Sequence, residues 1–228
     1  MSDPVCVIGD SVSGGVIMNE ETGRYTHYPD SFINLLSREL GFELHNRSKF
    51  GCTAPAALAR LDRFESDISS SNHTLVMLGG NDSDFDWPRV AETPEVWHDC
   101  NTPIEKFVEA YEALLDRLLV LGTNPVIINM IPVDGEGYFN WFSQKSDPAS
   151  LLRFLHRTES IEHWNEMFNL AIMGIAARRG LPFLDARSAF LRAKFFDGLF
   201  SRDGIHPSPA GHRALFDYLL PQARRYLV

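Results

Sequence analysis

The sequence predicts an α/β fold in which a parallel sheet is covered by helices on both faces. Short apolar segments alternate along the chain with longer segments whose apolar residues recur at helical spacing. Strands that alternate with helices imply right-handed crossover connections, which place helices on both faces of a parallel sheet. The chain has 228 residues, enough for one domain with a sizeable core. We therefore expect residues 1–228 to form a single domain.

The first half of the chain contains three predicted strands and two predicted helices. Residues 5–8 are continuously apolar, as in a strand buried on both faces. Residues 30–40 carry apolar side chains at helical spacing and are followed by Gly41, which indicates a helix and its end. A helix is expected at 54–64, between strands at 42–46 and 74–78.

The second half continues the alternation. A long helix is predicted at 104–121, followed by Gly122, and a fourth strand at 125–130. The next helix, 161–179, ends at Gly180, and a short fifth strand is expected at 182–184. Ser208 is typical of a helix N-cap and Pro209 of a first helical position, so they predict a helix at 210–220.

Two long connections interrupt this pattern, near 82–103 and 133–158. Each follows a predicted strand end, where long connections are commonly functional. The first connection is rich in acidic residues. Both connections contain aromatic residues: Trp87, Trp97, Tyr138, Trp141 and Phe142. Two interpretations of these rings stay open, since they could line a substrate pocket or form a small core of the connections themselves.

Composition argues against several classes of protein. The net charge of −9 disfavours nucleic-acid binding, which needs a basic patch, and binding to anionic membranes. Cys6, Cys52 and Cys100 are an odd number at unrelated spacings, which disfavours a disulfide framework or a zinc site. No apolar run is long enough to span a membrane, and the residues before the first strand lack a basic signal-peptide region. We expect a cytoplasmic protein without membrane insertion, and the sequence carries no signal for its oligomeric state.

Polar residues follow the ends of the first three predicted strands. Gly9-Asp10-Ser11 follows the first, Gly51 the second and Gly79-Gly80-Asn81-Asp82 the third. The carboxyl ends of parallel strands share one edge of the sheet, where active sites of this class form. Near the C-terminus, Asp203 precedes His206 by three residues. A serine, a histidine and an aspartate together can activate a hydroxyl group as a nucleophile at neutral pH.

These four segments, in this order, resemble the conserved blocks of the SGNH (GDSL-type) hydrolases. One difference is Val12, which stands where the first block usually has leucine. The resemblance implies a three-layer α/β/α fold with a flavodoxin-like, parallel five-stranded sheet. It also implies that the protein is an enzyme of the GDSL-like lipase/acylhydrolase type, which hydrolyses ester bonds. We expect no cofactor and no metal.

The resemblance also implies roles for individual residues. Ser11 would be the nucleophile, His206 the general base, and Asp203 the residue that orients His206. The backbone N–H groups of Ser11 and Gly51, with the side-chain amide of Asn81, would form the oxyanion hole. Taken alone, Ser11 could be a helix cap, Gly51 and Asn81 turn residues, and His206 a loop histidine; the ordered set favours the catalytic interpretation.

Competing motifs are incomplete. Ser13 stands where a G-x-S-x-G nucleophile elbow needs its last glycine. Gly135-Glu136-Gly137 lacks the third glycine of a dinucleotide-binding turn. Asp82, Asp84 and Asp86 imitate the start of a calcium loop, but Trp87 replaces the required glycine.

The natural substrate is predicted only by class. The acidic connection disfavours anionic phospholipids, so we favour a small-molecule ester with a short or acetyl chain, with acetylated carbohydrate as one example. Two alternatives remain: a lysophospholipase or thioesterase, and a catalytically inactive member of the fold that binds a ligand.

Overall fold

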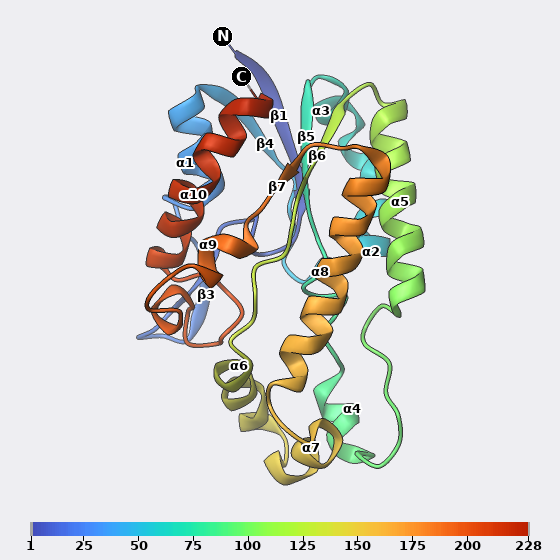
Figure 1. Cartoon of the computed structure of the whole chain (residues 1–228), viewed down its shortest axis with the longest axis vertical. Helices are drawn as coiled ribbons and strands as arrows, with labels where there is room; N and C mark the ends of the chain where they lie inside the picture. Colours follow the sequence, from blue (N-terminus) through green and yellow to red (C-terminus); the bar gives the residue numbers. More distant parts are fainter. Residues whose placement is uncertain (1, 228) are drawn as a thin grey trace.

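The computed structural model describes residues 2–227 and contains a five-stranded parallel sheet (Figure 1). Its strands are β1 (Ser2–Gly9), β4 (Phe42–Asn46), β5 (His73–Met77), β6 (Asn124–Ile128) and β7 (Phe183–Leu184). They lie in the order β4-β1-β5-β6-β7, and all neighbours pair in parallel. This is the flavodoxin-like order, in which the first strand lies between the second and the third. The predicted fold class is confirmed.

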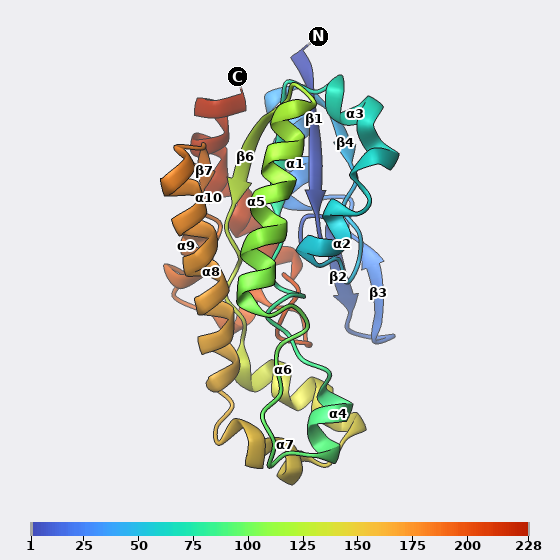
Figure 2. The same cartoon turned by 90° about the vertical axis from the view of Figure 1, so that its right-hand side faces the viewer.

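Helices form a layer on each face of the sheet. One layer consists of α1 (Phe32–Leu40), α9 (Arg187–Leu191) and α10 (Pro209–Leu227). The other consists of α2 (Ala54–Leu58), α3 (Glu65–Ser69), α5 (Ile104–Val120) and α8 (Ser160–Arg179). Figures 1 and 2 show the two layers on opposite sides of the strands. The termini lie together at the end of the sheet away from the strand ends that carry the polar motifs.

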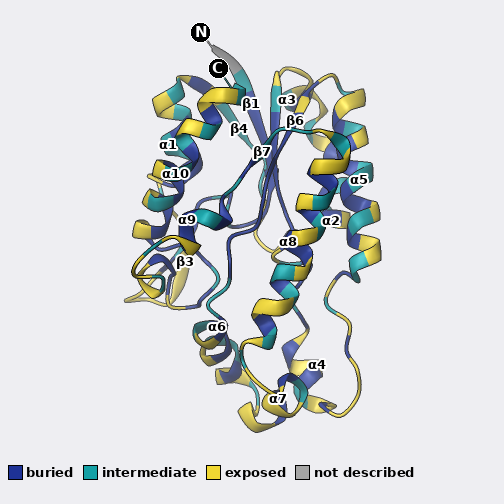
Figure 3. Ribbon diagram, viewed as in Figure 1, coloured by how far each residue is buried: buried dark blue, intermediate teal, exposed yellow. Residues whose placement is uncertain are grey.

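Strand β1 shows why its sequence is continuously apolar. Val5 and Val7 belong to the core cluster formed with α1 and α10, whereas Cys6 and Ile8 belong to the cluster formed with α2, α5 and α8. Successive side chains of a strand point to opposite faces, so a strand between two helical layers needs an apolar residue at every position. Figure 3 shows the central strands β5 and β6 mostly buried and the exposed residues mainly on the outer sides of the helices, whereas the edge strand β4 is buried only at Phe42.

Helix ends agree with their sequence signals. Gly41 and Gly180 adopt left-handed conformations at the ends of α1 and α8, with φ of 75° and 62°. The hydroxyl of Ser208 accepts a hydrogen bond from the N–H of Gly211 (3.1 Å), as expected of an N-cap. Helix α10 nevertheless continues through Pro221 to Leu227, beyond the predicted 210–220. An interior proline removes one N–H donor and crowds the carbonyl four residues before it, yet the buried Ala223 extends the apolar face of the helix past Pro221.

The predicted helix at 54–64 is wrong as a single element. The chain forms α2, then the 3₁₀ turn η1 (Leu61–Phe64), then α3. The buried residues Ala54, Ala57, Leu61 and Ile68 all enter the same core cluster. Their spacing suits one continuous helix as well as a series of short helical turns, so periodicity does not distinguish the two.

An antiparallel hairpin between the first strand and the first helix was not predicted. Strands β2 (Val16–Asn19) and β3 (Arg24–His27) pair so that Val16 faces His27 and Asn19 faces Arg24. Every residue of β3 is exposed, so it lacks the apolar pattern by which a strand is recognised. Figure 2 shows the hairpin beside the lower end of the sheet.

The two long connections fold into short helices that pack on each other. The first contains α4 (Trp87–Glu92), and the second contains α6 (Gly135–Phe142), the turn η2 (Ser143–Lys145) and α7 (Pro148–Leu155). Their buried residues form a third apolar cluster, in which the rings of Trp87 and Phe142 stack with centroids 4.1 Å apart. Figures 1 and 2 place these helices beyond the carboxyl ends of the strands.

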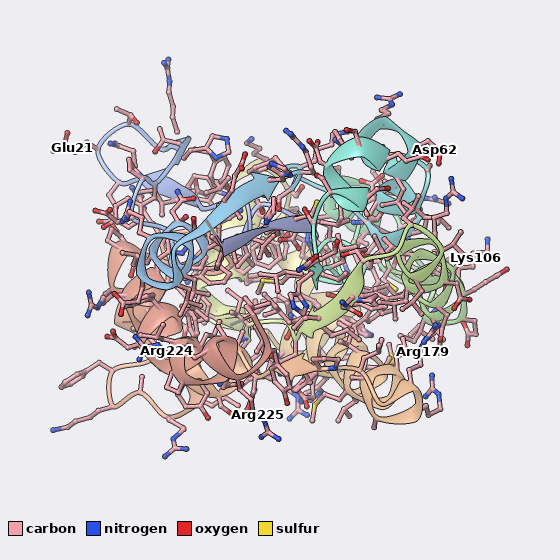
Figure 4. The ribbon with its side chains drawn as sticks, turned by 90° about the horizontal axis from the view of Figure 1, so that it is seen from above. Glu21, Asp62, Lys106, Arg179, Arg224 and Arg225 are labelled. Carbon is pink, nitrogen blue, oxygen red and sulfur yellow. The ribbon has the colours of Figure 1, made fainter. Side chains whose placement is uncertain are left out.

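The charged residues lie mainly around the outside of the two helical layers, as Figure 4 shows for Lys106, Arg179 and Arg224. Arg179 of α8 bonds Glu112 of α5 (2.8 Å), and Arg224 of α10 bonds Glu39 of α1 (2.7 Å). Pairs of this kind at the protein surface contribute little to stability, about 0–1 kcal/mol each. Within residues 2–227, none of the helices combines the length and the apolar character needed to cross a membrane.

Asp82, directly after the Gly79-Gly80-Asn81 turn, is a fully buried carboxylate that joins this loop to α2. Its two oxygens accept from the N–H of Ala54, at 3.0 and 3.1 Å. Burial raises the pKa of Asp82 to about 6. An unfolded aspartate has a pKa of about 4, so the stability from this group is present at low pH and is lost as pH rises from about 4 to about 6.

This shift predicts how the Asp82→Asn variant behaves. An amide retains an acceptor for Ala54 but does not ionise, so the free energy of unfolding of the variant relative to wild type should improve by roughly 1 kcal/mol between about pH 5 and about pH 7.5. Denaturant unfolding at both pH values measures this difference, with the exposed Asp86→Asn as control. An equal difference at the two pH values would contradict the argument.

Candidate active site

The structure brings Ser11, His206 and Asp203 into one chain of hydrogen bonds. Ser11 follows β1, whereas Asp203 and His206 lie in the loop between the 3₁₀ turn η3 (Asp197–Leu199) and α10. The Nε2 atom of His206 lies 2.8 Å from the Oγ atom of Ser11, and its Nδ1 atom lies 2.6 Å from Oδ2 of Asp203. Because an Nδ1–H faces the carboxylate, Nε2 is the acceptor for the serine hydroxyl. All three residues are buried.

The loop around Asp203 is built to hold this carboxylate. Its Oδ1 atom accepts from the N–H groups of Ile205 (3.2 Å) and His206 (3.1 Å), so the carboxylate and the imidazole are fixed on one turn. Ser201 closes the turn by donating its N–H to the carbonyl of His206 (2.7 Å). Burial alone would raise the pKa of Asp203, but the hydrogen bonds and charge of His206 and the backbone donors hold it below its usual value. Asp203 therefore stays ionised beside the histidine.

Gly204 is required inside this turn. Its φ is +71°, and a Cβ atom there would lie 2.4 Å from the backbone nitrogen of Tyr138 and 2.8 Å from the carbonyl of Asp134. The N–H of Asp134 also donates to the carbonyl of Gly204 (2.9 Å). The loop that carries Asp203 and His206 therefore packs backbone to backbone against the start of α6, which joins the second long connection to the site.

Three donors of the predicted oxyanion hole lie on loops at the same edge of the sheet. Gly51, with φ +70°, follows β4, and Asn81 follows β5. The Nδ2 atom of Asn81 donates to the carbonyl of Cys52 (3.3 Å), which ties its amide to the Gly51 loop. A side-chain amide has two N–H donors, so one remains for a ligand. Within residues 2–227, the backbone N–H groups of Ser11 and Gly51 donate to no protein acceptor.

A mostly apolar cavity of about 80 Å³ opens beside Ser11 and His206. Its walls come from the strand ends, the N-terminal part of α8 and the two long connections. The apolar lining residues are Val12, Met77, Leu78, Phe85, Trp87, Met130, Ile131, Pro132, Val133, Tyr138, Ile161, Trp164 and Ile205. On the same measure one water molecule needs about 10–15 Å³. The cavity therefore has room for a chain of a few carbon atoms.

Two buried carboxyl groups face this cavity. Asp84 accepts from the hydroxyl of Tyr138 (2.7 Å) and from Nε1 of Trp87 (2.9 Å), and burial raises its pKa to about 6. Asp10 accepts from the N–H of Val12 (2.9 Å), and burial likewise raises its pKa to about 6. Asp10 thus stabilises the turn that presents Ser11, and Asp84 stabilises the aromatic wall.

The three carboxylates of the incomplete calcium pattern are used separately. Asp82 binds the start of α2, Asp84 binds the aromatic wall, and Asp86 caps α4 through the N–H of Arg89 (3.3 Å). In the part of the chain that the structure describes, no group of three or more His, Cys, Asp or Glu side chains could hold a metal ion.

Some aromatic residues of the connections line the cavity, and some form a small core of the connections. Trp87 and Tyr138 line the cavity and also pack in the third apolar cluster, while Phe142 packs behind Trp87. Trp97 is 73% exposed, and neither it nor Trp141 lines the cavity. Sequence reasoning missed the cavity residues Phe85 and Trp164. It also missed Tyr25 and Phe50, whose rings lie against His206. No predicted element placed Tyr25 near the site, and Phe50 was missed although it directly precedes Gly51, a predicted site residue.

Replacement of Gly204 tests the packing of the loop that carries Asp203 and His206. Gly204→Ala should displace the turn, because its Cβ would overlap backbone atoms that side-chain motion cannot clear. We expect a loss of about 1–3 kcal/mol in the free energy of unfolding and a loss of turnover even below the new melting temperature. Thermal unfolding and ester hydrolysis measure the two effects. Gly198→Ala, where a Cβ would meet no atom within 4 Å, is the control, and equal behaviour of the two variants would contradict this account.

Comparisons with solved structures support the fold. A lipase/acylhydrolase from Enterococcus faecalis has a TM-score of 0.72 and 18% identity, covering 100% of this chain and 98% of that chain. The psychrotrophic esterase EstA from Pseudoalteromonas, inhibited by monoethylphosphonate, has a TM-score of 0.65 and 16% identity, covering 99% of each. A catalytic mutant of the acetylxylan esterase Axe2 from Geobacillus stearothermophilus has a TM-score of 0.64 and 18% identity, covering 96% of this chain and 93% of that chain.

No curated protein matches the chain significantly in sequence. The model of the GDSL-like lipase/acylhydrolase family, by contrast, matches residues 7–214, nearly the whole chain. This range contains the segments that carry Ser11, Gly51, Asn81, Asp203 and His206. The chain therefore belongs to the GDSL-like lipase/acylhydrolase family and is a hydrolase of ester bonds.

Proposed function

We propose that the protein is a serine esterase that cleaves short-chain carboxylic esters through an acyl-enzyme. The observation that carries the proposal is the hydrogen-bonded series Ser11–His206–Asp203 at the mouth of a small apolar cavity. The proposal assigns the whole chain to one domain, in which the connections near 82–103 and 133–158 form one wall of that cavity. A cytoplasmic location stays a prediction from the cysteine content.

In this mechanism Ser11 attacks the ester carbonyl while Nε2 of His206 takes its proton. A serine hydroxyl is too weakly acidic to attack alone, and a neutral imidazole can accept the proton and return it to the leaving alcohol. Asp203 keeps the Nδ1 proton in place and stabilises the imidazolium that forms. Water then enters, loses a proton to His206, and releases the acid from Ser11.

The developing oxyanion is stabilised by the N–H groups of Ser11 and Gly51 and by the free N–H of Asn81. The proposal is supported by the two backbone donors without protein acceptors and by the bond from Asn81 to Cys52, which fixes the direction of its amide. Donors held in place before the reaction stabilise the transition state without reorganisation.

The size of the cavity favours a short acyl chain over a long one. A palmitoyl chain is many times longer than the few carbon atoms that about 80 Å³ can hold. Acetyl esters fit, and an acetylated carbohydrate is one natural class, since its sugar would remain outside the cavity. A lysophospholipase or thioesterase activity and an inactive, ligand-binding protein are the alternatives.

Hydrolysis of p-nitrophenyl acetate, butyrate, octanoate and palmitate tests the chemistry and the substrate class together. We expect acetate and butyrate to be cleaved fastest, and Ser11→Ala to lower turnover by roughly 10⁴-fold or more. Ser13→Ala is the matched control, because the Ser13 hydroxyl bonds Ser48 (2.9 Å) and not His206. Faster cleavage of palmitate would favour the lipolytic alternative.

A fluorophosphonate probe separates the remaining outcomes. Labelling of wild type but not of Ser11→Ala, without turnover of any test ester, would indicate a narrow natural substrate. Failure to label wild type would favour the inactive protein.

Asn81→Ala tests the oxyanion hole. Loss of one such donor typically lowers kcat by about 100- to 1000-fold, with a smaller effect on KM because the donor acts on the transition state. Steady-state kinetics on p-nitrophenyl acetate measure both constants. Asn124→Ala is the control, since the exposed Asn124 side chain donates to the backbone carbonyl of Asn72 (2.9 Å) and does not line the cavity. Unchanged kcat in Asn81→Ala would exclude this role.

A further inference from the structure

Two aromatic rings from separate segments cover the imidazole of His206. The ring centroid of Tyr25, on β3, lies 5.0 Å from that of His206, and the ring of Phe50, in the loop after β4, stacks on it at 5.6 Å. Tyr25 and Phe50 also contact each other, with centroids 5.0 Å apart. His206 is only 3% exposed, whereas Tyr25 and Phe50 are 37% and 52% exposed. These two rings therefore separate the imidazole from solvent.

Besides its ring contact with His206, Tyr25 interacts with Asp203 through its hydroxyl. Partial burial, together with the charge and hydrogen bond of Asp203, raises the pKa of Tyr25 well above its usual value, and a hydrogen bond with Trp141 partly opposes this rise. A tyrosine that keeps its proton in this position is a donor to the carboxylate. The Trp141 indole N–H is only a donor, so the tyrosine oxygen accepts from it, and Tyr25 joins α6 to Asp203.

The Asp203 carboxylate has room for one more donor. An ionised carboxylate has about four acceptor sites. Three are used by the N–H groups of Ile205 and His206 and by Nδ1–H of His206. The Tyr25 hydroxyl is a donor suited to the fourth site, where it would keep the fully buried carboxylate from turning away from the histidine.

The hairpin that carries Tyr25 is tied to the catalytic loop at a second point. The N–H of Met18, on β2, donates to the hydroxyl of Ser201 (3.3 Å), and Ser201 closes the turn that contains Asp203 and His206. An isolated two-stranded hairpin is only marginally stable. These contacts, with the bond from the N–H of Val16 to the carbonyl of Ser11 (2.9 Å), therefore hold the hairpin over the site.

We propose that Tyr25 is a positioning residue for the Asp203–His206 pair, with its hydroxyl holding the carboxylate and its ring, beside Phe50, holding the imidazole. The proposal rests on the esterase function proposed above. It makes the exposed hairpin part of the catalytic apparatus, although Tyr25 itself touches no reacting atom.

The hydroxyl and the ring have separable effects. A hydrogen bond from the Tyr25 hydroxyl partly neutralises the negative charge of Asp203. Without that bond, the carboxylate stabilises the His206 imidazolium more strongly than in wild type. In Tyr25→Phe the acid limb of kcat/KM should move to higher pH by roughly half a pH unit to one pH unit. Tyr25→Leu also removes the stacked ring, and misplacement of the base should lower kcat/KM at every pH by roughly 10- to 100-fold.

The experiment measures the pH dependence of p-nitrophenyl acetate hydrolysis for wild type, Tyr25→Phe, Tyr25→Leu and Tyr28→Phe. Tyr28 lies in the same segment, but its ring stacks on His212 (5.7 Å), so Tyr28→Phe should reproduce the wild-type profile. The low-field NMR resonance of the His206 Nδ1 proton provides a readout without turnover. It should change in Tyr25→Phe and stay unchanged in Tyr28→Phe.

The outcomes separate this proposal from the proposed function. Ser11-dependent turnover in wild type, with an unshifted pH profile and an unchanged proton resonance in Tyr25→Phe, would overturn the role of Tyr25 and leave the esterase intact. Failure of wild type to react with either ester or fluorophosphonate would instead remove the esterase. Melting temperatures of the variants distinguish displacement of His206, which leaves the melting temperature near that of wild type, from a general loss of folding, which lowers it.

Discussion

A buried negative charge is the constraint on which the site depends. Asp203 is fully buried, and burial of an unpaired carboxylate is strongly unfavourable. The protein meets this constraint with donors from its own turn and with the His206 ring. Those bonds determine which imidazole nitrogen carries the proton, and hence which one faces Ser11. The role proposed for the histidine thus follows from the requirement that the buried Asp203 carboxylate be hydrogen-bonded.

The parallel sheet supplies the second requirement, which is proximity. Residues that are far apart in the sequence meet because β1, β4 and β5 end at the same edge. With β1 between β4 and β5, the loop that carries Ser11 lies between the loops of Gly51 and Asn81. The proposed nucleophile is thus flanked by the two loops proposed to donate to the oxyanion, which is the arrangement that acyl transfer needs. The fold itself therefore determines which loops can share one carbonyl group.

Sequence reasoning predicted the parts that depend on local patterns and on the order of the motifs. Val5 to Ile8 are apolar at every position because both faces of β1 are buried, so the strand was recognisable. Tyr25 was not, because β3 is exposed and its position comes from contacts with residues more than a hundred positions away. The cavity wall was only partly predicted, since Phe85 of the first connection meets Trp164 of α8 through tertiary packing and not through any spacing in the sequence. The break between α2 and α3 was missed because short helical turns preserve helical spacing.

Contacts between the sheet edge and the two connections indicate how substrate fit and the chemical step are coupled. The sheet edge carries the proposed reacting groups, while the connections form the far wall of the cavity. Gly204 and Tyr25 are two of the points where these parts meet: Gly204 packs on the backbone at the start of α6, and the Tyr25 hydroxyl interacts with Trp141 of the same helix. A movement of α6 would therefore change the shape of the cavity and the setting of Asp203 together. A substrate that fits the wall poorly would then be penalised in the rate of the chemical step as well as in binding.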